Sequence, residues 1–243
     1  MADKIGGGEE LRPQSPLLKK LENFWYHYKW HTILSVFALV VALVCILQMC
    51  GRDRVDLQLL YGGSMALEGE QIQKMESTMC GLIDDYDQNG ERKVSLHQYY
   101  VLAGSDREGA SAGQLQYSSE NRSAFDTEMQ AGEAMFCLLS SELYFDVYRA
   151  CYDAAQNRSA FCDLREITKG HAEVRYLTDS NGLPTDSAIL LKSTPLGSLA
   201  GFADLPDDTV ICLRRPPVVG NPDELAESLR RAEDTLRRIL AVQ

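Results

Sequence analysis

The residues best spaced for chemistry are the oxygen-bearing side chains of Asp85, Asp87 and Asn89, which Gly90 follows. They match positions one, three, five and six of a calcium-binding loop, where alternate side chains wrap a hard cation and glycine makes the sharp turn. Such a loop ends on a bidentate glutamate, but this chain has Leu96 there. A polar turn explains the same residues, because Asp, Asn and Gly are common turn formers. We therefore expect no tight calcium binding at this candidate metal site.

A second candidate site consists of aromatic and glycine residues where two predicted strands end. Tyr61 and Gly62 end one alternating segment, and Tyr99 and Tyr100 end another. Open α/β sheets bind ligands outside the carboxyl ends of their strands. These four residues are therefore candidates for lining a small-molecule pocket, and the sequence leaves its ligand unknown. Ordinary partial burial of aromatic side chains is the alternative interpretation.

Residues that could carry out catalysis are sparse. Beyond residue 50 the chain has two histidines, His97 and His171, and neither belongs to a Ser, His, Asp signature. The sequence contains no GxSxG, no HExxH and no phosphate-binding glycine loop. The five cysteines beyond residue 50 include no CxxC pair, which argues against a zinc–thiolate site. We expect a protein without enzymatic activity and without a cofactor.

The element that decides where these residues lie is the segment 32–49. Its 18 residues contain no charge, no glycine and no proline. As a helix it would span about 27 Å, which is enough to cross the hydrocarbon core of a bilayer. The preceding segment 24–30 has five aromatic residues among seven, and such rings suit the headgroup layer. We therefore predict one transmembrane helix that contacts membrane lipid through residues 32–49.

The charges beside this helix predict its orientation. Three lysines shortly precede the span, and two arginines follow it. This bias favours a cytoplasmic amino terminus, a single pass through the cell membrane and an extracellular carboxy-terminal domain. A cleaved signal would have a shorter leader and a small-residue cleavage site. Cys50 suggests lipidation as an alternative, but Met49 occupies the position where lipoprotein signals carry a small residue. We therefore favour an uncleaved signal anchor.

Composition divides the chain into three parts. We predict that residues 1–16 form a disordered cytoplasmic tail. Residues 17–50 are predicted to form an aromatic juxtamembrane segment and transmembrane helix, and residues 51–243 an extracytoplasmic α/β domain. This outer domain has 19 basic and 31 acidic residues, so its net charge is −12. An acidic surface argues against a nucleic-acid partner, because phosphates require a basic footprint.

Hydrophobic periodicity predicts the elements of the outer domain. Strands are expected over residues 55–61, 93–102, 134–139, 174–177, 188–191 and 210–213. Helices are expected over residues 64–84, 120–130, 141–151 and 223–242, and residues 104–118 read as a surface loop. The alternation of strands and helices predicts an α/β fold with a mixed, mostly parallel sheet covered by helices.

Two parts of the sequence resemble known groups of proteins. The leader LENFWYHYKWHTI, residues 21–33, resembles the opening of a group of uncharacterised single-pass membrane proteins of Gram-positive bacteria. Residues 55–167, from LQLLYGG to FCDL, are similar in their order of elements to the first lobe of extracellular solute-binding proteins of import systems. In that family the ligand lies between two lobes, whereas only 76 residues follow Ile167 here, too few for a second lobe.

These observations predict a non-enzymatic interaction or accessory module at the cell surface that resembles a reduced solute-binding lobe. Its partners would be membrane lipid and a membrane or cell-surface protein. A ligand-binding sensor or transport component is the alternative, and a ligand-sized pocket near Tyr61 would distinguish it. An enzyme of unknown class is the second alternative, and it would need His97 or His171 beside a carboxylate in a cleft.

Overall fold

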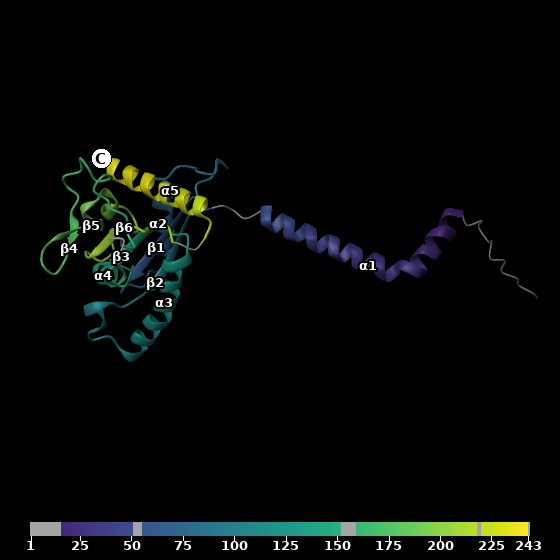
Figure 1. Cartoon of the computed structure of the whole chain (residues 1–243), viewed down its shortest axis with the longest axis horizontal. Coiled ribbons are helices and arrows are strands. Elements are labelled where there is room, and N and C mark those ends of the chain that lie inside the picture. The colour runs from purple at the N-terminus through teal and green to yellow at the C-terminus, as the bar shows by residue number, and fades with distance from the viewer. Residues whose placement is uncertain (1–15, 51–54, 152–158, 218–219, 243) are drawn as a thin grey trace, which may run out of the picture. The chain divides into compact units, whose positions relative to one another are not determined.

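The computed structural model describes residues 16–50, 55–151, 159–217 and 220–242. The chain divides into two compact units, residues 1–53 and residues 54–243 (Figure 1). Apart from Pro16, the predicted disordered tail lies outside the described residues.

The first unit contains one helix, α1 (Pro16–Cys50). Its segment Tyr28–Cys45 has a mean hydropathy of 1.7, and none of that segment is buried. Trp30 is 74% exposed, so its large aromatic ring is not covered by other residues of the protein. By length and composition this helix is able to cross a membrane, and it is compatible with a signal anchor or a signal sequence. The side chain of Cys50 lies outside the described residues.

The second unit is a six-stranded sheet between two layers of helices (Figure 1). Its strands are β1 (Leu57–Gly63), β2 (Val94–Tyr100), β3 (Phe136–Ser140), β4 (Tyr176–Thr178), β5 (Pro184–Leu190) and β6 (Thr209–Leu213). Its α-helices are α2 (Gly69–Cys80), α3 (Ala112–Ala131), α4 (Ser141–Ala150) and α5 (Pro222–Ala241). Side chains of α2 and α5 pack on one face of the sheet, and side chains of α3 and α4 pack on the other. The prediction of an α/β fold covered by helices is confirmed.

The prediction of a mostly parallel sheet is wrong. The strand order is β2-β1-β3-β6-β5-β4, and only the β1–β2 and β1–β3 pairs are parallel. The β3–β6, β6–β5 and β5–β4 pairs are antiparallel. Parallel neighbours need a long crossover, usually through a helix. Beyond α4 the strands are joined without an α-helix: a turn over residues 179–183 joins β4 to β5, and residues 191–208, which include 3₁₀ turns at Leu191–Ser193 and Pro195–Ser198, join β5 to β6.

Strand β3 lies in the middle of the core, and all five of its residues are buried. Phe136 and Leu138 belong to the apolar cluster on the α2 and α5 side. Cys137 and Leu139 belong to the cluster on the α3 and α4 side. This alternation is the one expected of a central strand whose neighbouring side chains point to opposite faces.

Helix α3 begins earlier than predicted, so the loop expected over residues 104–118 is shorter. Ser111 caps the helix: its hydroxyl accepts from the backbone N–H of Gln114, and the Gln114 side chain accepts from the Ser111 N–H. This reciprocal arrangement is a capping box. Only Ser118 and Phe125 of the helix are buried, so its apolar stripe is too thin for periodicity to reveal the first turns.

Strand β2 forms one edge of the sheet, and a side chain blocks part of that edge. The Glu76 carboxylate, from α2, accepts a hydrogen bond of 2.9 Å from the backbone N–H of Leu96. An edge strand otherwise leaves such groups open to pairing with another chain. The β2 edge therefore carries a charged side chain where an additional strand would bind.

The buried guanidinium of Arg214 ties β6 to the end of α3. Arg214 is 1% exposed, and it donates to the backbone carbonyls of Glu128 and Gly132. Burial lowers the pKa of Arg214. Carbonyls at the carboxyl end of a helix carry partial negative charge, so they stabilise the Arg214 cation there.

We predict that Leu138→Asp abolishes folding, because it buries a carboxylate without a partner in the middle of the sheet. That desolvation costs several kcal/mol, comparable with a typical free energy of unfolding of about 5–15 kcal/mol. Thermal unfolding of the full chain in detergent, followed by circular dichroism, measures the effect. Glu120→Lys on the exposed surface of α3 is the control and should change stability by about 0.5 kcal/mol or less. A Leu138→Asp variant that melts within a few degrees of the parent would contradict the central position of β3.

Candidate functional site

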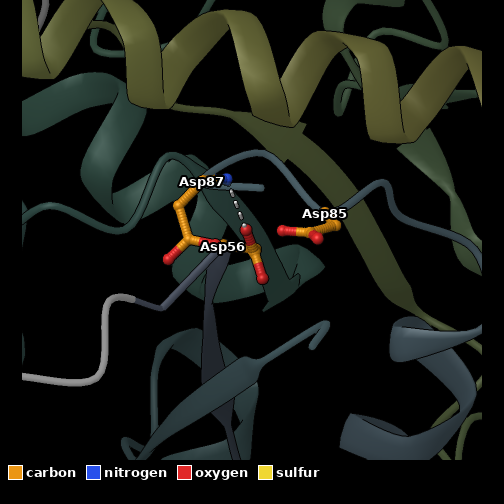
Figure 2. A group of neighbouring side chains, drawn as sticks. All are labelled: Asp56, Asp85 and Asp87. Atoms are coloured by element: carbon orange, nitrogen blue, oxygen red, sulfur yellow. Dashed lines mark hydrogen bonds between the residues drawn. The ribbon is translucent and has the colours of Figure 1, made fainter. Parts of the chain in front are cut away.

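The predicted calcium loop lies in the turn between α2 and β2, and the structure adds a third carboxylate to it. Asp85 and Asp87 come from the turn, and Asp56 comes from the residue before β1 (Figure 2). One oxygen from each of the three side chains lies within 4.8 Å of the other two. Asp56 is 2% exposed, so the cluster is closed on the side of β1.

The side chain of Asp56 holds the turn in place by accepting hydrogen bonds from backbone N–H groups of the turn. One carboxylate oxygen accepts from the N–H of Tyr86 at 2.9 Å and of Asp87 at 3.4 Å. The other oxygen accepts from the N–H of Lys93 at 2.9 Å, immediately before β2 begins. The carboxylate therefore fixes both ends of the turn to the start of β1, and its burial is compensated by hydrogen bonds.

Asp85 shapes the middle of the turn. Its two oxygens accept from the N–H groups of Gly90 at 2.7 Å and Asn89 at 3.1 Å. The Gly90 hydrogen bond is the main reason that the pKa of Asp85 lies below its usual value. Gly90 has a φ of 90° and Gln88 a φ of 58°, so the turn uses left-handed backbone at two positions. The Asn89 amide donates to the Asp87 carboxylate at 2.9 Å.

The cluster supplies oxygens of the kind that a hard cation prefers, but it lacks the bidentate glutamate that completes a calcium loop. Calcium takes six to eight oxygen ligands, and the expected bidentate position holds Leu96. Leu96 is 8% exposed and packs into the core, so it does not approach the turn. The side chains of Asp56 and Asp85 already accept backbone hydrogen bonds on both oxygens. Fixing the turn is therefore the role that the contacts themselves show.

Sequence reasoning missed Asp56, which lies about thirty positions before the loop. The available signal was an acidic residue at the start of an alternating apolar segment that the fold then buries. Aspartate is depleted in strands, so its presence there indicates a special contact. Only the parallel pairing of β1 with β2 brings the start of β1 beside the loop.

The four residues predicted to line a ligand pocket lie on neighbouring strands but divide between the two faces. Gly62 is paired with Tyr99 across β1 and β2. Tyr61 is 2% exposed and points into the core on the α2 and α5 side, and this burial raises its pKa. Tyr99 packs edge-to-face on Phe125 of α3 at 5.8 Å between ring centroids.

The remaining two residues of that prediction also make packing contacts. A Cβ atom at Gly62 would lie 2.8 Å from the Leu143 side chain, so glycine allows α4 to approach β1 closely. Tyr100 lies 5.6 Å from Tyr117 of α3 between ring centroids. Tyr61, Gly62, Tyr99 and Tyr100 therefore contribute to packing, and their role in ligand binding stays a prediction.

An open groove of about 690 Å³ lies between α4 and the β4–β5 hairpin. Its walls come from α4, the hairpin and Arg165, and the α4 and hairpin residues that line it are Glu142, Phe145, Tyr148, Arg149, Thr178, Asp179, Ser180, Leu183, Pro184, Thr185 and Asp186. The two histidines of the outer domain do not line it. Its volume falls within the range of about 300–1,000 Å³ that is usual for small-ligand sites.

Charged and aromatic side chains line much of the groove. The Arg149 guanidinium lies 5.9 Å above the centre of the Phe145 ring. Arg165 pairs with Asp163, and it also lies 3.8 Å from the Asp186 carboxylate. Sequence reasoning did not single out these residues, because exposed polar positions on a helix and a hairpin follow no periodicity that joins them. The available signal was Phe145 and Arg149 at adjacent turns on one side of the predicted helix.

Comparison with protein-family models, curated proteins and solved structures finds no match to this chain. The site must therefore be interpreted from its own geometry.

We predict that calcium binds the Asp56, Asp85 and Asp87 cluster no more tightly than a dissociation constant of about 10⁻⁴ M, because the bidentate ligand is missing. Isothermal titration of the full chain in detergent with calcium chloride measures this. The Asp85→Ala and Asp56→Asn variants provide the comparison. A tighter dissociation constant in the parent that both substitutions abolish would contradict the prediction and show that Asp56 replaces the missing ligand.

Proposed function

We propose that this chain is a membrane-anchored binding module, with its α/β domain outside the cell, that acts by interaction and not by catalysis. The observation that carries the proposal is the combination of an exposed apolar helix with a separate folded unit that has an open groove. The module would engage a membrane or cell-surface protein and serve as an accessory component there.

The anchor is supported by the surface of α1. Apolar side chains between Ile33 and Val44 are exposed around the helix, and no part of the segment Tyr28–Cys45 is buried against protein. A helix with an apolar surface all round is stable in lipid but not in water. Trp30 and Tyr28 stand where an aromatic belt would meet the headgroups.

The interpretation as a binding module is supported by the groove and by the distribution of reactive groups. Among the described residues of the groove there is no histidine and no cysteine. His171 instead lies 3.3 Å from the Glu173 carboxylate at a position outside the groove. A nucleophile, a base and an orienting group that converge on one point are the usual sign of an enzyme. We therefore rank an enzyme of unknown class below a binding role.

The proposed likeness to a reduced solute-binding lobe is supported by the order of elements. From β1 to α4 the chain alternates strand and helix as that lobe does. In the described part of the chain, the residues after 167 form β4, β5, β6 and α5, which join the same sheet and its helical layer. We propose that the single lobe binds its partner at the groove in place of a cleft between lobes. A ligand-binding sensor or transport component is the second candidate, which the volume of the groove favours.

We predict that the amino terminus is cytoplasmic and residue 243 is outside. A membrane-impermeant maleimide applied to intact cells should label a Gln243→Cys variant and leave an Ile5→Cys variant unlabelled. Cys151 is exposed and Cys80 and Cys162 are partly exposed, so both changes are made in a background in which these three cysteines and Cys50 are replaced by serine. Labelling of Ile5→Cys with protection of Gln243→Cys would reverse the orientation. Loss of residues 1–49 from the mature protein would show that the segment is a cleaved signal.

We predict that the groove contacts a partner in the native cell. Leu183 is 64% exposed at the groove, so a photo-crosslinking amino acid at this position should form a light-dependent adduct. The same amino acid at Leu115, which is exposed on α3 outside the groove, is the control. Gel mobility and intact mass measure the adducts. Equal adducts at both positions, or none at Leu183, would contradict a binding role for the groove.

A further inference from the structure

We propose that residues 17–28, in the amino-terminal part of α1, form an amphipathic helix that lies in the headgroup layer of the membrane and binds anionic lipid. The backbone of this segment is a continuous part of α1 (Pro16–Cys50). The inference rests on the proposed membrane anchor and adds a second, lipid-selective contact on the cytoplasmic side.

The sequence of residues 17–28 separates apolar from polar positions when it is placed on a helix. At about 100° per residue, its large apolar and aromatic residues all fall within one arc of about 120°. They are Leu17, Leu18, Leu21, Phe24, Trp25 and Tyr28. The positions outside the arc are those of Lys19, Lys20, Glu22, Asn23, Tyr26 and His27. An apolar arc opposite a polar one is typical of a helix that lies in a membrane interface.

A hydrogen bond lies where this segment meets the apolar span. The Thr32 hydroxyl donates to the backbone carbonyl of Tyr28 at 3.0 Å. A threonine that bonds to the carbonyl four residues earlier often bends its helix. Figure 1 shows that α1 is bent, with its purple amino-terminal part running in a different direction from the remainder. The segment and the span are therefore able to lie in different directions relative to a bilayer.

Continuity with the span favours the membrane, and not a second protein, as the partner of the apolar arc. If α1 continued straight, residues 17–31 would extend about 21 Å from the edge of the hydrocarbon core. The headgroup layer is only about 5–8 Å deep, so most of the arc would be in water. A helix that lies along the interface instead contacts the boundary between headgroups and acyl chains. Tyr28, the last residue of the arc, is 53% exposed and thus open to lipid.

The lysines of this region match an anionic membrane surface. On the helix, Lys20 borders the apolar arc on one side and Lys29 borders it on the other. Lysine side chains in such positions reach the lipid phosphates while their stems stay in apolar surroundings. Residues 17–31 have three lysines and one acidic residue, Glu22, so their net charge is +2 with histidine neutral. The outer domain has a net charge of −12, so attraction to anionic lipid belongs to this segment.

Tryptophan fluorescence of the full chain tests this inference, because both tryptophans of the protein, Trp25 and Trp30, lie in this region. Trp30→Phe and Trp25→Phe each leave one reporter. The chain is reconstituted in phosphatidylcholine nanodiscs with and without phosphatidylglycerol, and lipids brominated at different acyl positions measure the depth of each ring. A straight helix would place Trp25 about 7.5 Å farther from the bilayer centre than Trp30.

With phosphatidylglycerol present, Trp25 should lie at the depth of Trp30 or deeper. Acrylamide should quench Trp25 at least about twofold less than it does without phosphatidylglycerol. Leu21→Glu and Asn23→Glu, each in the Trp30→Phe background, are matched variants, because both add one negative charge, at the centre of the arc and opposite it. Leu21→Glu should raise the acrylamide quenching of Trp25 at least about twofold, and Asn23→Glu should change it less. Circular dichroism checks that both variants are folded.

The inference would be overturned if Trp25 were shallower than Trp30 with phosphatidylglycerol present, or if acrylamide quenched Trp25 equally with and without that lipid. Equal effects of Leu21→Glu and Asn23→Glu would also refute it. So would protection of Trp25 from acrylamide without quenching by any brominated lipid, since the arc would then pack on a second copy of the chain.

Trp30 separates this failure from failure of the proposed anchor. Quenching of Trp30 but not Trp25 by brominated lipid would leave the anchor standing and refute the interfacial helix. Absence of quenching at both positions would refute the anchor itself.

Discussion

Strand β3 is hydrogen-bonded along both of its edges, to the parallel strand β1 and to the antiparallel strand β6, and the remainder of the outer domain depends on this double pairing. The parallel side requires long crossovers, which α2 and α3 provide. Antiparallel pairing with β6 allows the strands in the last third of the chain to join the same sheet. All five β3 residues are buried, so both helical layers rest on it. The aspartate turn at one end and the groove beside the hairpin are thus held by a single core.

Aspartate side chains fix backbone geometry at both of the regions considered as sites. Asp56 and Asp85 hold the turn before β2, and Asp179 holds the turn between β4 and β5. Each carboxylate accepts hydrogen bonds from at least two backbone N–H groups, which satisfies donors that a loop would otherwise leave to water. The difference lies in what each turn presents. The first closes over buried Asp56, whereas the second holds Leu183 in solvent at the groove that Arg149 also lines.

The elements with a strong local signal were predictable from sequence. The apolar run at β3 and the leucine spacing of α5 identified a central strand and a covering helix, and the uncharged segment identified α1. The directions of the last strands were not predictable, because the pattern within a strand does not reveal how its connection returns. The residues of the two candidate sites could not be predicted from the sequence for a related reason. Asp56 meets Asp85 only through strand pairing, and Arg149 meets Leu183 only through folding of a hairpin against α4.

The carboxylate of Glu76 on the outer edge of β2 has a consequence for a chain tethered as we propose. Copies confined to a membrane plane meet at a raised effective concentration, and their sheets share a restricted range of orientations. Under those conditions an unpaired edge strand would pair with the edge strand of another copy, and the copies would aggregate. Because Glu76 occupies the Leu96 N–H, that position of the edge is closed to hydrogen bonding with a strand of a neighbouring copy. In a chain tethered as we propose, this blocked position would oppose clustering through the β2 edge.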